Sequence, residues 1–406
     1  MKRRTLLAAS LTLPFAARAQ GAAKVVVIGG GFGGASAARA LSAAGLNTVL
    51  VEANADYYAC PFSNAVVAGL RDMAAQRFTL RGLQVVRGTA TAIDPSARVV
   101  RVGETALPYD RLILSPGIDL DFAGLPGYDQ AAAEAMPHAW KAGPQTLLLR
   151  DRLAAMEDGG VVAMAIPPNP YRCPPGPYER ASLIAYYLKT HKPRSKLLLL
   201  DAKDVFSKQA LFTAAWARLY PGLVEWVGLS NGGKVTRVEP GSGTLETEFG
   251  SHHADVANVI PPQRAGAIAA QAGVADRTGW CPIDPVSFES RLVPGIHVIG
   301  DAAIAGAMPK SAFSANAQAK VCADAVIALL AGQAAAEPRL INTCYSLIAP
   351  DAAISVAGVY KPTGGVLADI PGAGGTSPLD APPEARTQEA LYADAWFRTI
   401  TAEAFG

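Results

Sequence analysis

A glycine-rich turn between an apolar strand and a small-residue helix is the feature that most constrains this chain. The stretch "AKVVVIGGGFGGASAARALSAAGLNTVLVE" carries Gly29, Gly31 and Gly34 directly after the first strand, and a second strand, expected at 47–51, ends in Glu52. This order predicts a βαβ unit that binds a dinucleotide. The first glycine permits the tight turn, the second lets backbone N–H groups approach a pyrophosphate, and the third lets the helix pack on the strand. The acid accepts hydrogen bonds from ribose hydroxyls.

Two later segments indicate which dinucleotide is bound. "YDRLILSPGI", at 109–118, contains Gly117, and "GIHVIGDAAI", at 295–304, contains Gly300 and Asp301. Both resemble signatures of the two-dinucleotide-binding flavoproteins, in which the aspartate at the position of Asp301 binds the ribityl and phosphate side of FAD. The resemblance implies FAD as cofactor and a glutathione-reductase-like α/β fold with two nucleotide-binding units.

The segment "MPKSAFSANAQAKVC" follows the second of these signatures and is expected to begin a helix. In the flavoproteins this helix directs its positive end at the flavin pyrimidine, where negative charge collects when flavin is reduced. Lys310, near the helix start, either adds to that effect or is a solvated lysine.

The second α/β unit lacks the corresponding glycine turn. Its strand, expected at 160–166, is followed by "PPNPYRCPPG". Prolines remove amide donors, and without glycine the backbone cannot approach a phosphate. The sequence therefore predicts that NAD(P)H does not bind in this unit, so that electrons come from another donor.

The first residues read as an export signal. "MKRRTLLAASLTLPFAARA", at 1–19, has a basic start, a short apolar run and an A-x-A ending, which is typical of a cleaved secretory leader. The arginine pair suggests the twin-arginine route, and a Sec leader is the alternative. The mature chain is therefore expected in the periplasm.

Charge and hydropathy exclude two classes of partner. The full chain has a formal net charge of +2, and the leader contributes four positive charges and no acid, which leaves −2 for the mature protein. A nucleic-acid-binding protein needs a basic patch, which this balance does not favour. No other apolar stretch is long enough to span a bilayer.

The cysteines and histidines show no local metal or haem motif. The five cysteines occur singly, and no Cys-x-x-Cys-His is present, so the chain has no c-type haem attachment site of its own. The five histidines show no metal-ligand spacing, and no metal site is expected. Cys322 is expected in a helix core, and Cys281 has no assigned role.

Longer motifs resemble the flavoprotein subunit of flavocytochrome c sulfide dehydrogenase. They extend along essentially the whole mature chain and include "YRCPPGPYERAS", "IPPQRAG", "GWCPID", "NTCYSLIAPDAAISVAGVY" and "DAWFRTITAEAFG". The resemblance implies that Cys173 and Cys344 form a redox-active disulfide over the flavin, where sulfide is oxidised. It also implies a c-type cytochrome subunit as electron acceptor, with haem only on that partner. From the residues alone, an inert disulfide or two buried thiols are the alternatives.

Two further residues follow from this chemistry. Hydrosulfide can attack a disulfide and give a persulfide and a thiolate. Glu179 lies close enough in the sequence to Cys173 to take the sulfide proton, or else it is a surface helix residue paired with a cation. The resemblance also implies a thioether between Cys60, in "DYYACPFSN", and the flavin ring; a free thiol or noncovalent FAD is the alternative.

The expected domain organisation is discontinuous. An FAD-binding domain at 20–143 and 259–330 encloses a degenerate NAD-like domain at 144–258, and a C-terminal domain follows at 331–406. Two rival functions remain open: a sulfide:quinone oxidoreductase and a non-catalytic flavoprotein accessory of a sulfur-oxidising complex. A quinone enzyme should carry an apolar C-terminal anchor, whereas the final helix is rich in charged residues.

Overall fold

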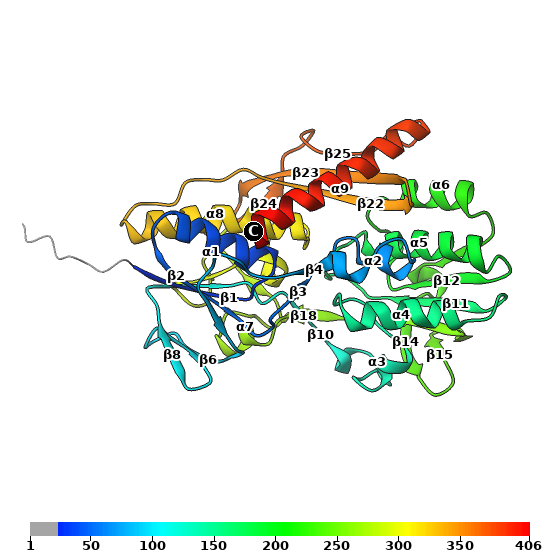
Figure 1. Ribbon diagram of the computed structural model, residues 1–406, viewed down its shortest axis with the longest axis horizontal. Coiled ribbons are helices and arrows are strands. Elements are labelled where there is room, and N and C mark those ends of the chain that lie inside the picture. The colour runs from blue at the N-terminus through cyan, green and yellow to red at the C-terminus, as the bar shows by residue number, and fades with distance from the viewer. Residues whose placement is uncertain (1–22) are drawn as a thin grey trace, which may run out of the picture.

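The computed structural model describes residues 23–406, and the expected leader at 1–19 lies outside the described residues. Two parallel α/β units lie side by side, and a long hairpin and the C-terminal helix extend across both of them (Figure 1). The predicted α/β fold class is confirmed. Within the described part of the chain, no helix is both long and apolar enough to cross a membrane.

The first unit is built on a five-stranded parallel sheet with the order β20-β9-β1-β2-β5. Its central strands are apolar and buried, as expected for a parallel sheet covered on both faces. Helices α1 (Phe32–Ala43) and α8 (Ala312–Leu330) pack together on one face. The strands are β1 (Lys24–Ile28), β2 (Asn47–Glu52), β5 (Val85–Arg87), β9 (Arg111–Leu114) and β20 (Ile296–Val298).

The second unit repeats this plan with a four-stranded parallel sheet of order β13-β12-β11-β17. Three longer helices accompany it, α4 (Pro144–Ala155), α5 (Gly176–His191) and α6 (Gln209–Leu219). Its strands are β11 (Val161–Ile166), β12 (Lys196–Asp201), β13 (Val224–Val227) and β17 (Val256–Val259), and an antiparallel meander of β14 (Val235–Glu239), β15 (Thr244–Thr247) and β16 (Gly250–His253) lies beside it.

One antiparallel strand pair connects the two units. The chain leaves the first unit through β10 (Ile118–Leu120) and returns through β18 (Gln263–Ala265), and these two strands pair with each other. Because the exit and the return are hydrogen-bonded, the loops at the carboxyl ends of the two parallel sheets are held close together.

The C-terminal segment is a hairpin followed by a helix. β22 (Leu340–Ala349) pairs with β23 (Ala352–Thr363), which also pairs with β24 (Val366–Asp369) and β25 (Gly375–Thr376). Helix α9 (Pro383–Phe405) packs on the hairpin, and its aromatic rings Phe397 and Phe405 contact Phe78 of the first unit. This aromatic cluster fixes the end of the chain to the first unit.

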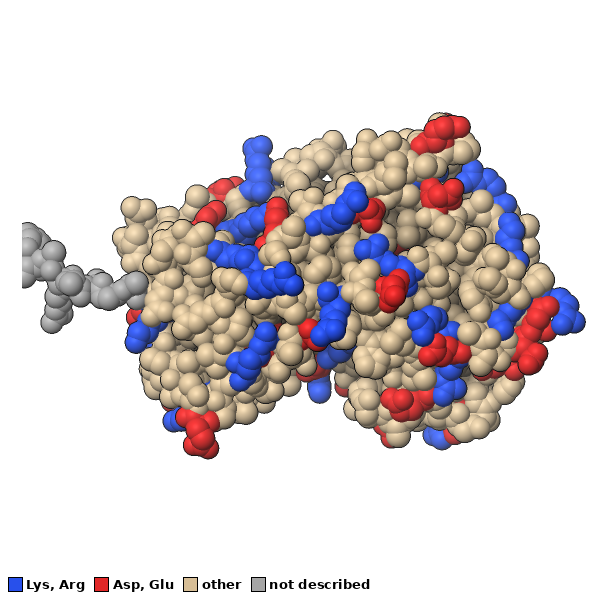
Figure 2. Space-filling model, viewed as in Figure 1, with Lys and Arg blue, Asp and Glu red and all other residues tan. Residues whose placement is uncertain are grey.

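Shorter elements complete the described chain. They are β3 (Tyr57–Tyr58), α2 (Ser63–Val67), β4 (Arg77–Phe78), β6 (Ala90–Asp94), β7 (Val99–Val102), β8 (Thr105–Pro108), α3 (Ala132–Ala135), α7 (Ile268–Gln271), β19 (Cys281–Pro282) and β21 (Ala303–Ile304). On the surface, basic and acidic side chains are interspersed over the visible face, with broad uncharged stretches between them (Figure 2).

Candidate functional site

A cavity of about 570 Å³ lies where the two units and the hairpin meet. Its volume is in the range of pockets that bury a cofactor-sized ligand. Loops that follow parallel strands of both sheets line it, as expected for a site at the carboxyl ends of such strands. The sequence-predicted residues that line it are Gly29, Gly31, Glu52, Cys60, Gly117, Cys173, Glu179, Gly300, Asp301 and Cys344.

The glycine turn has the geometry that a dinucleotide requires. Gly29 has φ +100°, and a Cβ added there would lie 2.2 Å from the Ser115 carbonyl oxygen. Gly34 does not line the cavity, but a Cβ on it would lie 1.9 Å from the carbonyl oxygen of Gly29. Neither position accepts a side chain without moving backbone, so the turn stays open and the helix stays close to the strand.

Glu52 at the end of β2 organises the same turn. One carboxylate oxygen accepts a hydrogen bond from the backbone N–H of Gly30 at 2.7 Å, and the other accepts from the backbone N–H of Asn54 at 2.8 Å. The carboxylate therefore lies beside the glycine turn at the edge of the cavity, where the ribose of a dinucleotide would be bound.

Asp301 presents a buried acceptor to the same cavity. It follows β20, and its Oδ1 atom is buried without a hydrogen-bond partner among residues 23–406. Its Oδ2 atom lies 3.9 Å from Nη1 of Arg172, and burial raises the pKa of the Asp301 carboxyl. Buried polar atoms are nearly always satisfied, so this oxygen indicates a donor supplied by a ligand. A ribityl hydroxyl of FAD fits this requirement.

The start of α8 also faces the cavity. Ser311 caps the helix by accepting from the backbone N–H of Ser314 at 3.0 Å, and Ser311, Ala312 and Phe313 line the cavity. A helix N-terminus favours negative charge on a group in front of it. The residues present therefore fit FAD. The features that fit it are the glycine turn, Glu52, Asp301 and this helix end.

Lys310 is not brought to this cavity. Its ammonium donates to the carbonyl oxygens of Asp301 and Ala303 at 2.8 Å each and lies 3.9 Å from the ring centroid of Trp280. Burial lowers its pKa to about 8. The side chain is therefore neither a solvated lysine nor a lining residue; it is bound to the backbone behind Asp301.

Cys173 lies in the loop between β11 and α5, where its backbone is held in a left-handed conformation with φ +57°. Its N–H donates to the carbonyl of Lys310 at 2.8 Å, which anchors this loop of the second unit to the first. A Cβ on Gly176 would lie 3.0 Å from Cys173 Sγ, so glycine at that position leaves room for the sulfur. Burial, more than any other cause, raises the pKa of the Cys173 thiol.

Cys344 reaches the cavity from strand β22. Its Sγ atom accepts a hydrogen bond from Asn342 Nδ2 at 3.3 Å, and Asn342 Oδ1 accepts from Ser311 Oγ at 2.6 Å. Cys173 and Cys344 thus meet in one cavity although they are far apart in the sequence. Both are free thiols in this structure. The redox-active disulfide between them stays a prediction.

Glu179, on the first turn of α5, is part of the same cluster. Its Oε1 atom accepts from the backbone N–H of Leu347 at 2.9 Å, and its Oε2 atom accepts from Asn64 Nδ2 at 2.8 Å. Burial is the main cause that raises the pKa of this carboxyl. Glu179 is therefore not a surface residue paired with a cation, and its raised pKa makes the carboxylate a stronger proton acceptor than an ordinary glutamate.

Cys60 lines the cavity from the loop between β3 and α2. Its Sγ atom lies 3.9 Å from the carbonyl oxygen of Trp140, and the Arg172 guanidinium also donates to that carbonyl. The thiol is half-buried and free. The structure places Cys60 where a bond to a ligand is sterically possible, and the covalent attachment of FAD stays a prediction.

Arg180 is a cavity residue that sequence reasoning did not identify. Its side chain is 2 % exposed and donates to Asn64 Oδ1 at 2.9 Å, to Asn258 Oδ1 at 3.0 Å and to the carbonyls of His138 and Ala139. Every acceptor is neutral, and burial lowers its pKa to about 10. In the sequence, Arg180 looks like any charged residue on a helix, and no pattern around it distinguishes a buried arginine from a solvated one.

The second unit ends its strand β12 in an acid, as the first unit does with Glu52. That acid, Asp201, is fully buried and accepts from Lys203 Nζ at 2.6 Å, Tyr178 Oη at 2.6 Å and Trp226 Nε1 at 3.0 Å. Lys203 also donates to the carbonyl of Pro167 at 2.9 Å. The carboxylate of Asp201 therefore already accepts three hydrogen bonds from the protein, whereas in a dinucleotide site the equivalent acid accepts from ribose hydroxyls.

Comparison with known families assigns three segments of the chain. Residues 23–146 match the family described as pyridine nucleotide-disulphide oxidoreductase. Residues 146–261 match the central part of the sulfide dehydrogenase [flavocytochrome c] flavoprotein chain, and residues 336–405 match the family described as flavocytochrome c sulphide dehydrogenase, flavin-binding. The last two segments contain Cys173 and Cys344.

One curated relative agrees with this assignment, and two solved structures share the fold. Over 48 residues, 11 % of this chain and 100 % of the relative's sequence, the chain is 50 % identical to the sulfide dehydrogenase [flavocytochrome c] flavoprotein chain of Chlorobaculum thiosulfatiphilum. Its fold is similar to that of the sulfide:quinone oxidoreductase of Aquifex aeolicus, with a TM-score of 0.72, 18 % identity and coverage of 94 % of this chain and 92 % of that one. A NAD-dependent persulfide reductase from A. fulgidus has a TM-score of 0.60 at 16 % identity, covering 94 % of this chain and 77 % of that one.

Proposed function

Because the chain belongs to the family of flavocytochrome c sulfide dehydrogenase flavoprotein chains, we propose that it oxidises sulfide with FAD and passes the electrons to a c-type cytochrome subunit. The observation that carries this proposal is the meeting of Cys173, Cys344 and Glu179 in the cavity that also contains the glycine turn. FAD, when bound, supplies the two-electron acceptor of the reaction.

The protein's own residues would perform the sulfur chemistry. In the oxidised enzyme Cys173 and Cys344 form a disulfide, and HS⁻ attacks one of its sulfur atoms. A new S–S bond forms to the attacking sulfur while the original S–S bond breaks, so that one cysteine becomes a persulfide and the other a thiolate. A second HS⁻ then takes the outer sulfur of the persulfide and leaves as HSS⁻, the start of a polysulfide, so that both cysteines are thiolates. These two thiolates must give up two electrons for the disulfide to form again.

Glu179 would hold the proton that H₂S loses before the attack. Its carboxylate lies in the cavity with both cysteines, and the hydrogen bonds from Leu347 and Asn64 hold it in place. A proton accepted on a carboxylate oxygen of Glu179 can leave to solvent after the persulfide forms. Arg180, buried beside this cluster, would stabilise the negative charge that appears on sulfur.

The remaining features of the proposal concern the cofactor, the donor and the compartment. Cys60 would provide the covalent attachment point for FAD. NAD(P)H would not be a donor, because the loop after β11 is rich in proline and the acid at the end of β12 is occupied by Lys203. The leader at 1–19 would direct the mature chain to the periplasm.

A sulfide:quinone oxidoreductase-like activity is the second candidate, favoured by the similarity of the fold to the Aquifex enzyme. Anaerobic mixing of the purified chain with sulfide should bleach the flavin. Mixing with NADH for the same time should leave the flavin oxidised. Electron delivery to cytochrome c, without delivery to a soluble quinone analogue, is the expected outcome. Bleaching by NADH at the sulfide rate would contradict the proposal, and reduction of the quinone alone would favour the second candidate.

A further inference from the structure

Lys208 is a buried cation that the proposed reaction does not use. It lies directly before α6, and its side chain is 8 % exposed. Its ammonium donates to the carbonyl of Cys344 at 2.9 Å, to Ser346 Oγ at 2.8 Å and to the carbonyl of Ile354 at 3.4 Å. All three acceptors belong to the β22–β23 hairpin, so Lys208 fastens that hairpin to the second unit.

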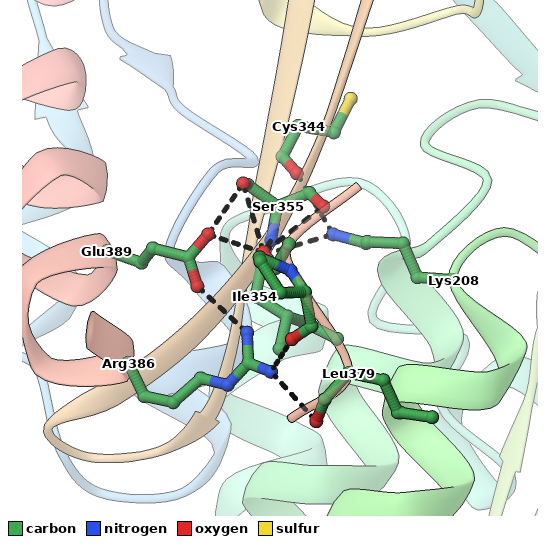
Figure 3. A network of polar contacts seen from close by, with 9 residues as sticks. Lys208, Cys344, Ile354, Ser355, Leu379, Arg386 and Glu389 are labelled. Atoms are coloured by element: carbon green, nitrogen blue, oxygen red, sulfur yellow. Dashed lines mark hydrogen bonds and ion pairs between the residues drawn. The ribbon is translucent and has the colours of Figure 1, made fainter. Parts of the chain in front are cut away.

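The hairpin is held from its other side by α9. Glu389 accepts from Ser355 Oγ at 2.8 Å and is paired with Arg386 at 3.1 Å. Figure 3 shows Lys208 and Glu389 approaching the hairpin from opposite sides, with the sulfur of Cys344 pointing away from both. The backbone of Cys344 is thus bound by a lysine of the second unit, while its sulfur accepts a hydrogen bond from Asn342, two residues earlier on β22.

A buried ammonium with only neutral acceptors is costly, and a methionine of similar length would avoid that cost. Lys192 has the same kind of environment, since it is 9 % exposed and donates to the carbonyls of Ala154 and Met156. Those carbonyls lie at the end of α4, where a cation satisfies orphan helix acceptors. Lys208 serves no helix end, so its charge calls for another explanation.

The ionisable groups around Lys208 provide that explanation. The ionisable groups close enough to act on the charge of Lys208 are Cys344 on β22, Glu179 on α5, Cys173 in the loop before α5 and Glu389 on α9. Three of these four belong to the proposed sulfur site. Burial lowers the pKa of Lys208 to about 8, so the side chain is charged at neutral pH.

We propose that Lys208 is the positioning residue of Cys344, which fixes the backbone of that residue beside Cys173 and stabilises the negative charge that the sulfur of residue 344 carries while the disulfide is open. This inference rests on the proposed function. Opening the pair forms one S–S bond and breaks another, and it leaves negative charge on sulfur without requiring a proton from Lys208. Its role is therefore geometric and electrostatic.

The test compares variants of the full FAD-loaded chain. Lys208→Met removes the charge, Lys208→Arg retains it, and Lys192→Met is the matched control that removes an equally buried ammonium far from the cavity. After reduction, each protein is treated with iodoacetamide at pH 7, and mass spectrometry measures alkylation of Cys344 and Cys173 separately. Alkylation of Cys344 should slow about tenfold in Lys208→Met relative to that of Cys173, because thiolate is the reactive form. Lys192→Met should match the parent, and Lys208→Arg should recover most of the rate.

Equal alkylation of Cys344 in Lys208→Met and in the parent would overturn the inference and leave Lys208 a structural residue. If Lys208→Met does not fold, Lys208→Gln takes its place. Equal alkylation of Cys344 in Lys208→Gln and in Lys208→Arg would then overturn the inference in the same way. Sulfide-dependent flavin bleaching is measured on the same samples. A parent chain that does not react with sulfide would refute the proposed function, whereas the alkylation comparison still decides the role of Lys208.

Discussion

The two α/β units place equivalent loops beside the same cavity but build them from different residues. β1 and β11 each lead into a loop and a helix, and the neighbouring strands end in Glu52 and Asp201. In the first unit the loop is rich in glycine, and Glu52 lines the cavity. In the second unit the loop is rich in proline, and Asp201 is paired with Lys203. Cys173 is the residue of that loop whose thiol lines the cavity.

If the proposed function holds, this difference is a change in the function of a binding loop while the fold around it is preserved. Backbone N–H groups suit a phosphate because they are small, numerous and charge-neutral. A thiol suits a sulfur substrate because it forms and breaks a covalent bond. The prolines of the second loop remove the donors, and Cys173, whose backbone is left-handed, presents its thiol to the cavity from that loop.

The largest effect is expected from removing either thiol of the proposed pair. Cys173→Ser and Cys344→Ser should each keep FAD but lower sulfide-dependent flavin reduction by about 10⁴ to 10⁶, the usual cost of losing a nucleophile. Single-turnover bleaching measures the rate, and Cys322→Ala, a fully buried thiol outside the cavity, serves as control. If the two cysteines instead form an inert disulfide, its loss in either variant would lower the free energy of unfolding by about 2–5 kcal/mol and leave the rate of the folded enzyme unchanged.

The next effect concerns the proton acceptor on the helix after that loop. Glu179→Gln should slow bleaching by about 10² to 10⁴, which is typical for a general base. Because burial raises the pKa of Glu179, the parent rate should fall with decreasing pH already above the ordinary glutamate range. A pH–rate profile of the Gln variant without that acid limb would support the role, and an unchanged limb would contradict it.

A glycine from each loop distinguishes the two functions. Gly29→Ala forces a Cβ against the Ser115 carbonyl and should weaken FAD retention, with a strain of about 1–3 kcal/mol. Gly176→Ala places a Cβ near Cys173 Sγ and Trp140, so it should keep FAD but slow the reaction with sulfide. Flavin content per chain and bleaching rate separate these outcomes. FAD loss in both variants would show that the second loop still contributes to cofactor binding.

The predicted covalent bond between Cys60 and FAD can be tested qualitatively in the first unit. If Cys60 carries the cofactor, flavin fluorescence should stay with the denatured parent protein on a gel and be absent from the band of Cys60→Ala. Acid precipitation of the same two samples measures how much flavin is released. Complete release from the parent would show that the cavity holds FAD without a covalent bond.

The smallest effect is a pH dependence of stability that Lys208 introduces. Its pKa is lowered from 10.5 to about 8, so between these values the unfolded chain binds more protons than the folded one. The contribution of this group to the free energy of unfolding therefore rises with pH across that window, by on the order of 1–3 kcal/mol. Thermal unfolding of the parent and of Lys208→Met from pH 7.5 to 10 isolates it. The parent should gain relative to the variant, and a constant difference would contradict the assignment.

The first unit was predictable because its signals are local. The turn from Gly29 to Gly34 and the acid at Glu52 follow one another along the chain, and each residue type has a backbone reason to be there. The proline-rich loop was likewise visible, since an absent glycine pattern is as local as a present one. A final helix was also expected from the sequence, and α9 spans Pro383–Phe405.

Much of the site could not be read from the sequence because its contacts join distant segments. Lys208 bonds to Cys344, and Arg180 bonds to Asn64 and Asn258, without any spacing that relates them. Buried charges with neutral partners look like ordinary surface charges in a sequence. Lys310 shows the same limit: its place at a helix start left open a role at the flavin or a solvated side chain, and only the structure shows its ammonium bound to the carbonyls of Asp301 and Ala303.

The β22–β23 hairpin, which carries Cys344, also determines at what point in synthesis of the chain the site is complete. A nascent chain emerges from the N-terminus onward, so both α/β units are complete before residues 340–363 have been synthesised. The glycine turn and Asp301 are then already present, whereas the second thiol is still missing. A chain interrupted before the hairpin would lack half of its reactive pair, which postpones sulfur chemistry until the polypeptide is nearly finished.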